Sequence, residues 1–202
     1  MNFSFTRYDD YWDGRFVVMY HETSDYIYIP IPKAGSSSIR DTLSVGKYPL
    51  IEKETIEKKS KFKFTFVRNP YTRLLSCWNG WIRKKDNSRL YKIEGIYKGM
   101  SFSEFVHIVK DIPNELCDQH FAPMTTILDN IELDFVGKLE NMNQDWKELS
   151  NTIPIPKEVL HIESTRTNDS MKSFYNDELF EIVRKRYASD FEMFNYNTIW
   201  ES

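Results

Sequence analysis

The stretch YIYIPIPKAGSSSIRDTL, residues 26–43, constrains the fold more than any other part of the chain. Its first six residues are mostly β-branched or aromatic, which predicts a buried strand, and a helical pattern starts at Ser36. Small residues between the two let backbone N–H groups approach an anion, and the helix start adds a partial positive charge. The layout predicts an anion-binding loop made of Lys33, Ala34, Gly35, Ser36, Ser37 and Ser38.

The identity of the anion is open at this point. The loop lacks the Gly-Lys-Ser/Thr ending of an ATP-binding loop. A plain Pro-Gly turn with serine caps is the alternative interpretation of the same residues.

Strand-like and helix-like segments alternate along the rest of the chain. Strands are predicted within 15–20, 61–67 and 133–140, and helices within 70–82, 101–112, 141–153 and 177–194. The charged segment 51–61 is predicted to be a solvated loop or a short helix. This alternation predicts a P-loop-like, three-layer α/β domain with a central, mostly parallel sheet flanked by helices. We expect a single domain over residues 1–202, with residues 1–25 as an N-terminal extension.

A second candidate anion contact follows the strand at 61–67. Arg68 ends that strand, Asn69 and Pro70 are a favoured helix start, and Ser76 lies two turns into the helix. On a helical wheel Ser76 and Arg73 fall on the polar side, so a guanidinium and a hydroxyl can hold a phosphate there. A surface serine and an arginine paired with a carboxylate remain the alternative. Ligands of parallel sheets bind beyond the carboxyl ends of the strands, where both Lys33 and Arg68 are predicted to lie.

Composition excludes some classes of protein. The chain has 27 basic and 30 acidic residues, a net charge of −3, which argues against general nucleic-acid binding. Cys77 and Cys117 form neither a disulfide framework nor a metal-ligand pattern, and Cys77 is predicted to be a buried thiol. No apolar segment has the length of a signal-peptide core or a membrane span. We therefore expect a soluble, cytoplasmic protein without a bound metal or stable membrane insertion; its oligomeric state is not readable.

Five stretches, in order, resemble motifs of the sulfotransferases that use 3′-phosphoadenosine 5′-phosphosulfate (PAPS). PKAGSSSIR resembles their 5′-phosphosulfate loop, and FVRNPYTRLLSCW resembles their 3′-phosphate motif. CDQHFAPMTTIL, DFVGKLENMNQDW and RYASDFEMFNY are similar to stretches of the carbohydrate-sulfotransferase branch, family 2 type. The resemblance covers roughly residues 26–196. In the last stretch Asn195 replaces the family's glycine, and asparagine also tolerates left-handed backbone angles at a helix end.

The resemblance implies PAPS as the donor and a carbohydrate or other hydroxyl-bearing acceptor. The loop would hold the phosphosulfate, with Lys33 at the bridging oxygen, and Arg68 and Ser76 would hold the 3′-phosphate. The segment Ser164, Thr165 and Arg166 would contact the nucleotide. Because the Golgi relatives carry a membrane anchor and this sequence shows none, we expect a cytoplasmic, bacterial enzyme, with a bacterial surface glycan or its precursor as the acceptor.

The general base is assigned to His120. It lies in a predicted loop and in a matched stretch, whereas His21 lies outside the resemblance, His107 is mid-helix and His161 is implied to line the nucleotide site. Glu22 and Asp118 are the alternative bases. Asp118 can also orient His120, but a plain loop acid is the simpler interpretation.

Two other classes of function remain open at the level of the sequence. A nucleotide kinase or NTPase would share the strand–loop–helix phosphate site, and a non-catalytic protein would bind the nucleotide without turnover. The acceptor pocket is expected within residues 83–125 and the aromatic N-terminus. Trp12, Trp78 and Trp81 can stack on sugar rings, although tryptophans at such positions are more often part of the core.

Overall fold

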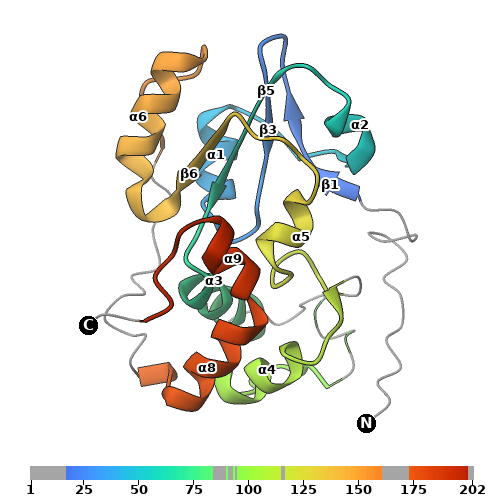
Figure 1. Cartoon of the computed structure of the whole chain (residues 1–202), viewed down its shortest axis with the longest axis vertical. Helices are drawn as coiled ribbons and strands as arrows, with labels where there is room; N and C mark the ends of the chain where they lie inside the picture. Colours follow the sequence, from blue (N-terminus) through green and yellow to red (C-terminus); the bar gives the residue numbers. More distant parts are fainter. Residues whose placement is uncertain are drawn as a thin grey trace. The chain divides into compact units, whose positions relative to one another are not determined.

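The computed structural model describes residues 17–83, 90, 93, 95–114, 117–160 and 173–199. These residues form two compact units (Figure 1). The sheet unit falls within Asp9–Arg68 and Ile127–Ser164, and the helical unit within Asn69–Thr126 and Thr165–Ser202. The chain passes from one unit to the other after Arg68 and again inside helix α5 (Met124–Leu128).

The sheet unit contains a four-stranded sheet in the order β2-β3-β5-β6. Its strands are β2 (His21–Glu22), β3 (Tyr26–Ile29), β5 (Phe62–Val67) and β6 (Phe135–Lys138). β3 pairs with β5 and β5 with β6 in parallel, while β2 is antiparallel to β3. The predicted α/β class with a mostly parallel sheet is confirmed.

Two short strands form a separate antiparallel pair. β1 (Val17–Met19) lies within the predicted strand at 15–20 and pairs with β4 (Leu50–Glu52). Helix α2 (Lys53–Glu57) follows β4 directly, and its Lys53 and Ile56 are buried. The segment 51–61 therefore includes the predicted short helix, but it is not fully solvated, because one turn of it packs inward.

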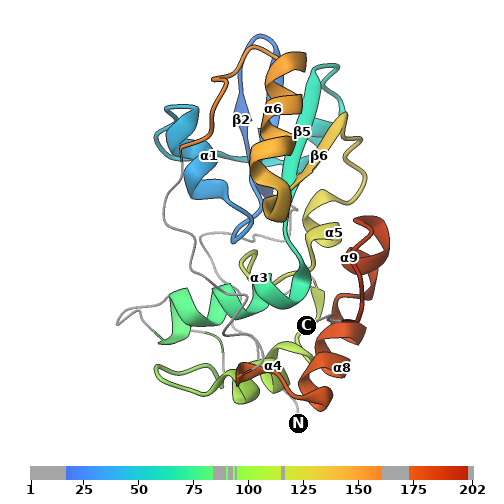
Figure 2. The ribbon, with the colours of Figure 1, turned by 90° about the vertical axis from the view of Figure 1, so that its left-hand side faces the viewer.

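One face of the four-stranded sheet carries the core of this unit. Tyr26 and Tyr28 on β3 and Phe64 and Phe66 on β5 alternate along their strands and point to the same face. Helices α1 (Ser36–Thr42) and α6 (Met142–Thr152) cover that face, as Figures 1 and 2 show. They contribute the buried residues Ile39, Met142, Trp146 and Leu149.

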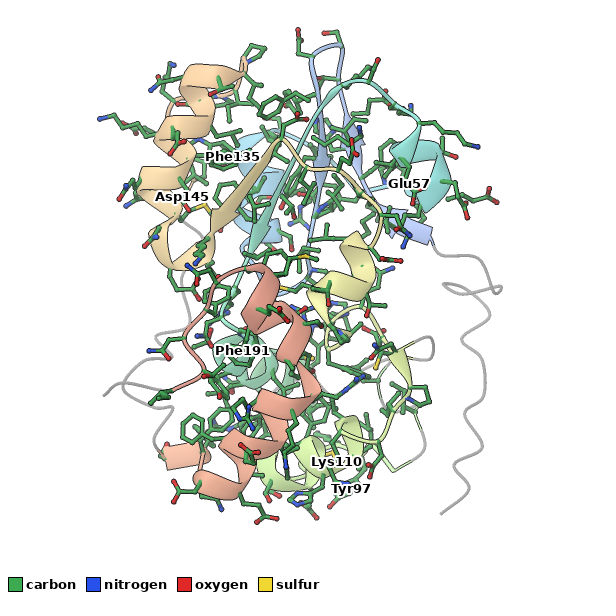
Figure 3. All side chains as sticks on the ribbon, in the orientation of Figure 1. Glu57, Tyr97, Lys110, Phe135, Asp145 and Phe191 are labelled. Carbon is green, nitrogen blue, oxygen red and sulfur yellow. The ribbon has the colours of Figure 1, made fainter. Side chains whose placement is uncertain are left out.

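The end of β6 is fixed to α6 through a short 3₁₀ turn, Leu139–Asn141. Asp145 on α6, which Figure 3 labels, accepts a hydrogen bond of 2.6 Å from the backbone N–H of Lys138. Trp146 donates its indole N–H to the carbonyl of Pro156 at 2.9 Å, which keeps this large side chain satisfied inside the core.

The helical unit is built from α3 (Pro70–Cys77), the π-helical segment η1 (Trp78–Arg83), α4 (Phe102–Val109), α8 (Asp177–Arg186) and α9 (Ala188–Met193). Its caps follow the sequence signals. The Asn69 side chain accepts from the N–H of Tyr71, and Ser101 and Glu104 form a capping box.

An aromatic cluster holds the helices of this unit together. The ring of Tyr71 lies 4.8 to 5.7 Å, between centroids, from the rings of Tyr175, Phe180 and Phe191. The hydroxyl of Tyr175 donates to the backbone carbonyl of Tyr71 at 2.9 Å. Helices α3, α8 and α9 are thereby joined around one buried tyrosine.

The single helix predicted over 177–194 is wrong. The chain forms α8 and α9, separated at Tyr187, whose backbone angles of φ −113° and ψ 26° leave the helical range. Leu179, Val183, Tyr187 and Phe191 are all buried at the predicted four-residue spacing. The periodicity continues through the break and for this reason did not reveal it. At the end of α9, Asn195 has a φ of 50°. This left-handed conformation is the one expected of an asparagine that replaces the family's glycine.

Gly137 on β6 provides a test of the sheet packing. A Cβ at this position would lie 2.6 Å from Cζ and 2.7 Å from Cδ1 of Phe66, whose ring is buried against Phe135 and Trp146. We expect Gly137→Ala to lower the free energy of unfolding by about 1–3 kcal/mol, because the fully buried Phe66 ring would have to shift. The measurement is chemical denaturation. Gly46→Ala is the control, since nothing lies within 4 Å of a Cβ there; equal effects of the two changes would contradict the packing argument.

Candidate functional site

The predicted anion-binding loop connects β3 to α1 and is locally strained. Lys33 and Gly35 have φ values of 70° and 83°, in the left-handed region. Such values are uncommon for a lysine and are typical of backbone that gathers N–H groups around an anion. The φ of Gly35 favours glycine over any other residue, and a Cβ there would also lie 2.8 Å from Cε of Met142 and 3.0 Å from Cδ1 of Leu139.

The rest of the loop is held by backbone contacts. The N–H of Ala34 donates to the carbonyl of Ile31 at 3.2 Å, and Ala34 is buried. The hydroxyl of Tyr48 donates to the carbonyl of Ser36 at 2.9 Å. Ser36, Ser37 and Ser38 form the first turn of α1, where Ser37 is exposed.

Arg68 lies directly against this loop. It follows β5, which is the parallel neighbour of β3, and its guanidinium is buried. Its Nη1 donates to the backbone carbonyl of Lys33 at 3.2 Å. The structure thus brings Lys33 and Arg68 together at the carboxyl ends of two adjacent strands of the sheet unit.

The other predicted anion ligands lie elsewhere in the chain. Ser76 is buried on α3, in the helical unit. Arg166 lies outside the described residues, as do His161, Ser164, Thr165 and Trp12.

Arg73 differs from the sequence prediction. It was expected on a polar helix face, but its side chain is only 1% exposed. Its Nη1 donates to the carbonyl of Ala122 at 2.6 Å, and its Nη2 donates to the carbonyl of Gln119 at 2.8 Å. Arg73 therefore holds the loop that carries His120.

His120 sits in that loop, between α4 and α5, beside two side chains of the helical unit. Its Nδ1 lies 2.7 Å from Oδ1 of Asp118, and the same oxygen accepts the backbone N–H of His120 at 2.9 Å. The ring of Trp81, on η1, lies 4.4 Å from the imidazole centroid at an angle of 56°. Asp118 thus makes the orienting contact that the sequence analysis had set aside in favour of a plain loop acid.

The far side of the loop is held by the C-terminal helices. The hydroxyl of Tyr187 donates to the carbonyl of Phe121 at 2.6 Å. Asp190 is fully buried and accepts the N–H groups of Met124 and Thr125 at 2.9 and 2.8 Å, and the Thr125 hydroxyl at 2.9 Å. With Arg73, these residues fix the backbone on both sides of His120.

The charge of Asp190 is stabilised from two directions. Burial raises the pKa of the Asp190 carboxyl, while the positive charge of Arg73 and the hydrogen bonds from Thr125 and Met124 act to lower the same pKa. Removal of either charged partner would leave the other buried charge less compensated. The sequence could have pointed to this network, because its three residues lie in two of the stretches that resemble family motifs. Arg73 is in FVRNPYTRLLSCW, and Tyr187 and Asp190 are in RYASDFEMFNY.

The alternative bases and the other described histidines are in different surroundings. Glu22 pairs with Lys59 at 2.6 Å and Lys61 at 2.8 Å, and these contacts lower the pKa of its carboxyl. Burial lowers the pKa of His21. His107 contacts the Ser103 carbonyl and Glu178 on the surface of α4.

Predictions were also made for Cys77, for Trp78, and for metal binding and membrane insertion. Cys77 is a buried thiol that forms no disulfide, as predicted. Trp78 is core, with its indole N–H donating to the Met100 carbonyl at 2.9 Å. Within the part of the chain that the structure describes, there is no group of three or more histidine, cysteine or acidic residues placed to hold a metal, and none of the helices there has the length and apolarity to span a membrane.

Comparison with known proteins gives one family. The family model described as "Sulfotransferase family" matches residues 18–197. Carbohydrate sulfotransferase 11 of Mus musculus is 28% identical over 207 residues, which cover 86% of this chain and 57% of the relative. Carbohydrate sulfotransferase 9 of Homo sapiens is 28% identical over 167 residues, 67% of this chain and 38% of the relative. The chain spans little more than half the length of the first of these relatives. No solved structure matches it significantly.

These relatives correct one expectation. They come from mouse, rat, human and zebrafish, which contradicts the prediction of a cytoplasmic bacterial enzyme. That prediction relied on the lack of an apolar segment in the sequence, and such a lack does not report the organism or the compartment.

The network around the His120 loop gives a testable stability prediction. Arg73→Leu should lower the free energy of unfolding by about 2–4 kcal/mol, because two buried carbonyls lose a charged donor and Asp190 loses its compensating charge. Thermal and chemical denaturation measure the change. Arg184→Leu is the matched control, as this arginine is exposed and pairs only with Glu181 among the contacts described; it should leave stability nearly unchanged. If Arg73→Leu were equally neutral, Arg73 would not be holding the loop.

Proposed function

The chain belongs to the sulfotransferase family, and from that premise we propose that it transfers a sulfuryl group from PAPS to a hydroxyl group of a carbohydrate. The observation that supports this most is the contact of Arg68 with the backbone of the Lys33 loop at the ends of two parallel strands. It gives one edge of the sheet two positive side chains and a strained loop, which suits a ligand with more than one anionic group.

The donor half of the proposal assigns a role to each predicted ligand. The loop from Lys33 to Ser38 binds the 5′-phosphosulfate through backbone N–H groups and serine hydroxyls. Arg68 and Ser76 bind the 3′-phosphate, and Arg166 adds a further contact to the nucleotide. ATP has no 3′-phosphate, so the contacts of Arg68 and Ser76 with this phosphate would select PAPS over ATP. The absence of a Gly-Lys-Ser/Thr ending agrees with a donor that needs no Mg²⁺ ligand from the loop.

The reaction is an in-line displacement at sulfur. The acceptor oxygen forms a bond to sulfur, and the bond from sulfur to the bridging oxygen of the 5′-phosphate breaks. The bridging oxygen leaves with the electron pair, giving adenosine 3′,5′-bisphosphate, and Lys33 stabilises its developing charge. His120 accepts the proton of the acceptor hydroxyl. Positioning and charge stabilisation do most of the work, as in phosphoryl transfer.

A carbohydrate acceptor is proposed from the relatives, which are named carbohydrate sulfotransferases. Trp81 supports the same choice, because a partly exposed indole beside the proposed base can stack on a sugar ring. A kinase or NTPase is disfavoured by the loop ending and by the family match. A non-catalytic nucleotide-binding protein is disfavoured by the oriented histidine.

Nucleotide selectivity tests the donor assignment. By calorimetry, adenosine 3′,5′-bisphosphate should bind more tightly than ADP or ATP, and Arg68→Ala should weaken bisphosphate binding roughly 10- to 100-fold, about 1.5–3 kcal/mol for a charge-assisted contact. Lys47→Ala is the control for loss of one positive charge, since Lys47 is exposed on the same unit. Equal binding of ADP and the bisphosphate by the unmodified protein would remove PAPS as the donor.

Replacement of His120 tests the base. His120→Ala should abolish transfer of labelled sulfate from PAPS to a panel of glycans, a loss of roughly 100-fold or more, while bisphosphate binding stays nearly intact. His107→Ala is the matched control on the surface of α4. Turnover that survives His120→Ala would assign the proton to another residue.

A further inference from the structure

The contact between Asp118 and His120 determines which nitrogen of the imidazole carries a proton. Oδ1 of Asp118 accepts the backbone N–H of His120, and the same oxygen lies 2.7 Å from Nδ1. An ionised carboxylate has only acceptors, so Nδ1 must be the donor in this contact. The lone pair of a neutral His120 is then on Nε2.

The pair is shielded from water. The side chain of His120 is 14% exposed and that of Asp118 is 10% exposed. A contact of this kind is screened less than a surface ion pair, so the carboxylate acts strongly on the imidazole. His120 nevertheless keeps part of its side chain exposed, as a group that meets an acceptor must.

Rotation of the imidazole is restricted from a second direction. The ring of Trp81 lies against it with a centroid distance of 4.4 Å. Trp81 belongs to η1, and π-helical segments of this kind often occur at functional sites. Behind the loop, Arg73, Tyr187 and Asp190 hold the backbone of residues 119 to 125. The imidazole is therefore fixed by the Trp81 ring, by the contact with Asp118 and by the backbone of its loop. A side chain fixed in this way is suited to proton transfer in one direction.

We propose that Asp118 is a positioning residue, which holds the Nδ1–H tautomer of His120 and presents Nε2 to the acceptor hydroxyl. The inference rests on the proposed function and deepens it. The hydroxyl proton passes to Nε2 as the oxygen–sulfur bond forms, and the imidazolium that results is stabilised by the carboxylate of Asp118. Asp118 itself takes no proton in this step.

Other charged or titratable groups of the helical unit also face the loop. Arg73 lies on α3, Tyr187 on the turn between α8 and α9, and Asp190 on α9. Arg73 contacts the backbone on both sides of His120, Tyr187 and Asp190 contact it on the C-terminal side, and all three remain in place when Asp118 is replaced. A shift in the titration of His120 on replacement of Asp118 therefore reports the carboxylate itself.

The test uses Asp118→Asn, which keeps the size of the side chain and an acceptor for the backbone N–H but removes the charge. A carboxylate beside an imidazole favours its protonated form, so its loss should move the acidic limb of the kcat/KM profile to lower pH. The plateau kcat should fall roughly 10- to 1000-fold while bisphosphate affinity stays unchanged. Asp118→Glu should restore part of both properties. Asp111→Asn is the matched control, because that carboxylate is exposed and pairs with Lys110.

A measurement without turnover separates this inference from the proposed function. NMR of the ligand-free protein with ¹⁵N-labelled histidine should show His120 protonated on Nδ1 when neutral, and Asp118→Asn should lower the pH midpoint of its titration. The Nε2–H tautomer in the unmodified protein, or an unchanged midpoint in Asp118→Asn, would overturn the role of Asp118 even if sulfate transfer is demonstrated. A lowered midpoint with an unchanged kcat would also overturn it, because the contact would not act on the reaction. Failure of PAPS to bind would instead refute the proposed function.

Discussion

The parallel pairing of β3 with β5 is the constraint on which the sheet unit depends. It places Tyr26 and Tyr28 beside Phe64 and Phe66, so that one face of two strands becomes the apolar surface that α1 and α6 cover. The same register ends both strands at one edge of the sheet. Core formation and the meeting of the Lys33 loop with Arg68 are therefore consequences of one set of backbone hydrogen bonds, and a slip in register would lose both.

The helical unit solves a different problem, the burial of charge. Arg73 and Asp190 would each be costly to bury alone. Arg73 is satisfied by carbonyl groups of the loop between α4 and α5, and Asp190 by N–H groups of the first two residues of α5. The loop in turn gains fixed partners for carbonyl and N–H groups that a buried turn would otherwise leave unmet. This exchange holds the described residues on both sides of His120, which have no regular structure.

The sequence predicted the features that depend on local chemistry and missed those that depend on distant partners. The strand β3 follows from its β-branched and aromatic residues, the strand β5 from side-chain alternation, and the cap at Asn69 from a capping residue. The two-residue strand β2 and the pairing of β4 with β1 carry no such pattern, because each is too short to show alternation. Arg73 was placed on a polar face because a helical wheel cannot tell a solvated polar position from a buried one with carbonyl partners.

The break at Tyr187 is another feature that the sequence pattern does not reveal, and it lies where the C-terminal helices contact the His120 loop. A helix that ran straight through 177–194 would keep the four-residue spacing of its buried side chains, so periodicity does not distinguish it from α8 followed by α9. The turn at Tyr187 is where the tyrosine hydroxyl meets the Phe121 carbonyl, and three residues later Asp190 meets the start of α5. The irregular point of the C-terminal helices is thus the point at which they hold the His120 loop. We infer that the Lys33 loop depends mainly on backbone conformation, at Lys33 and Gly35, whereas the proposed base depends on a buried polar network. Substitutions that change backbone freedom should therefore affect the Lys33 loop, and substitutions that change charge should affect the position of His120.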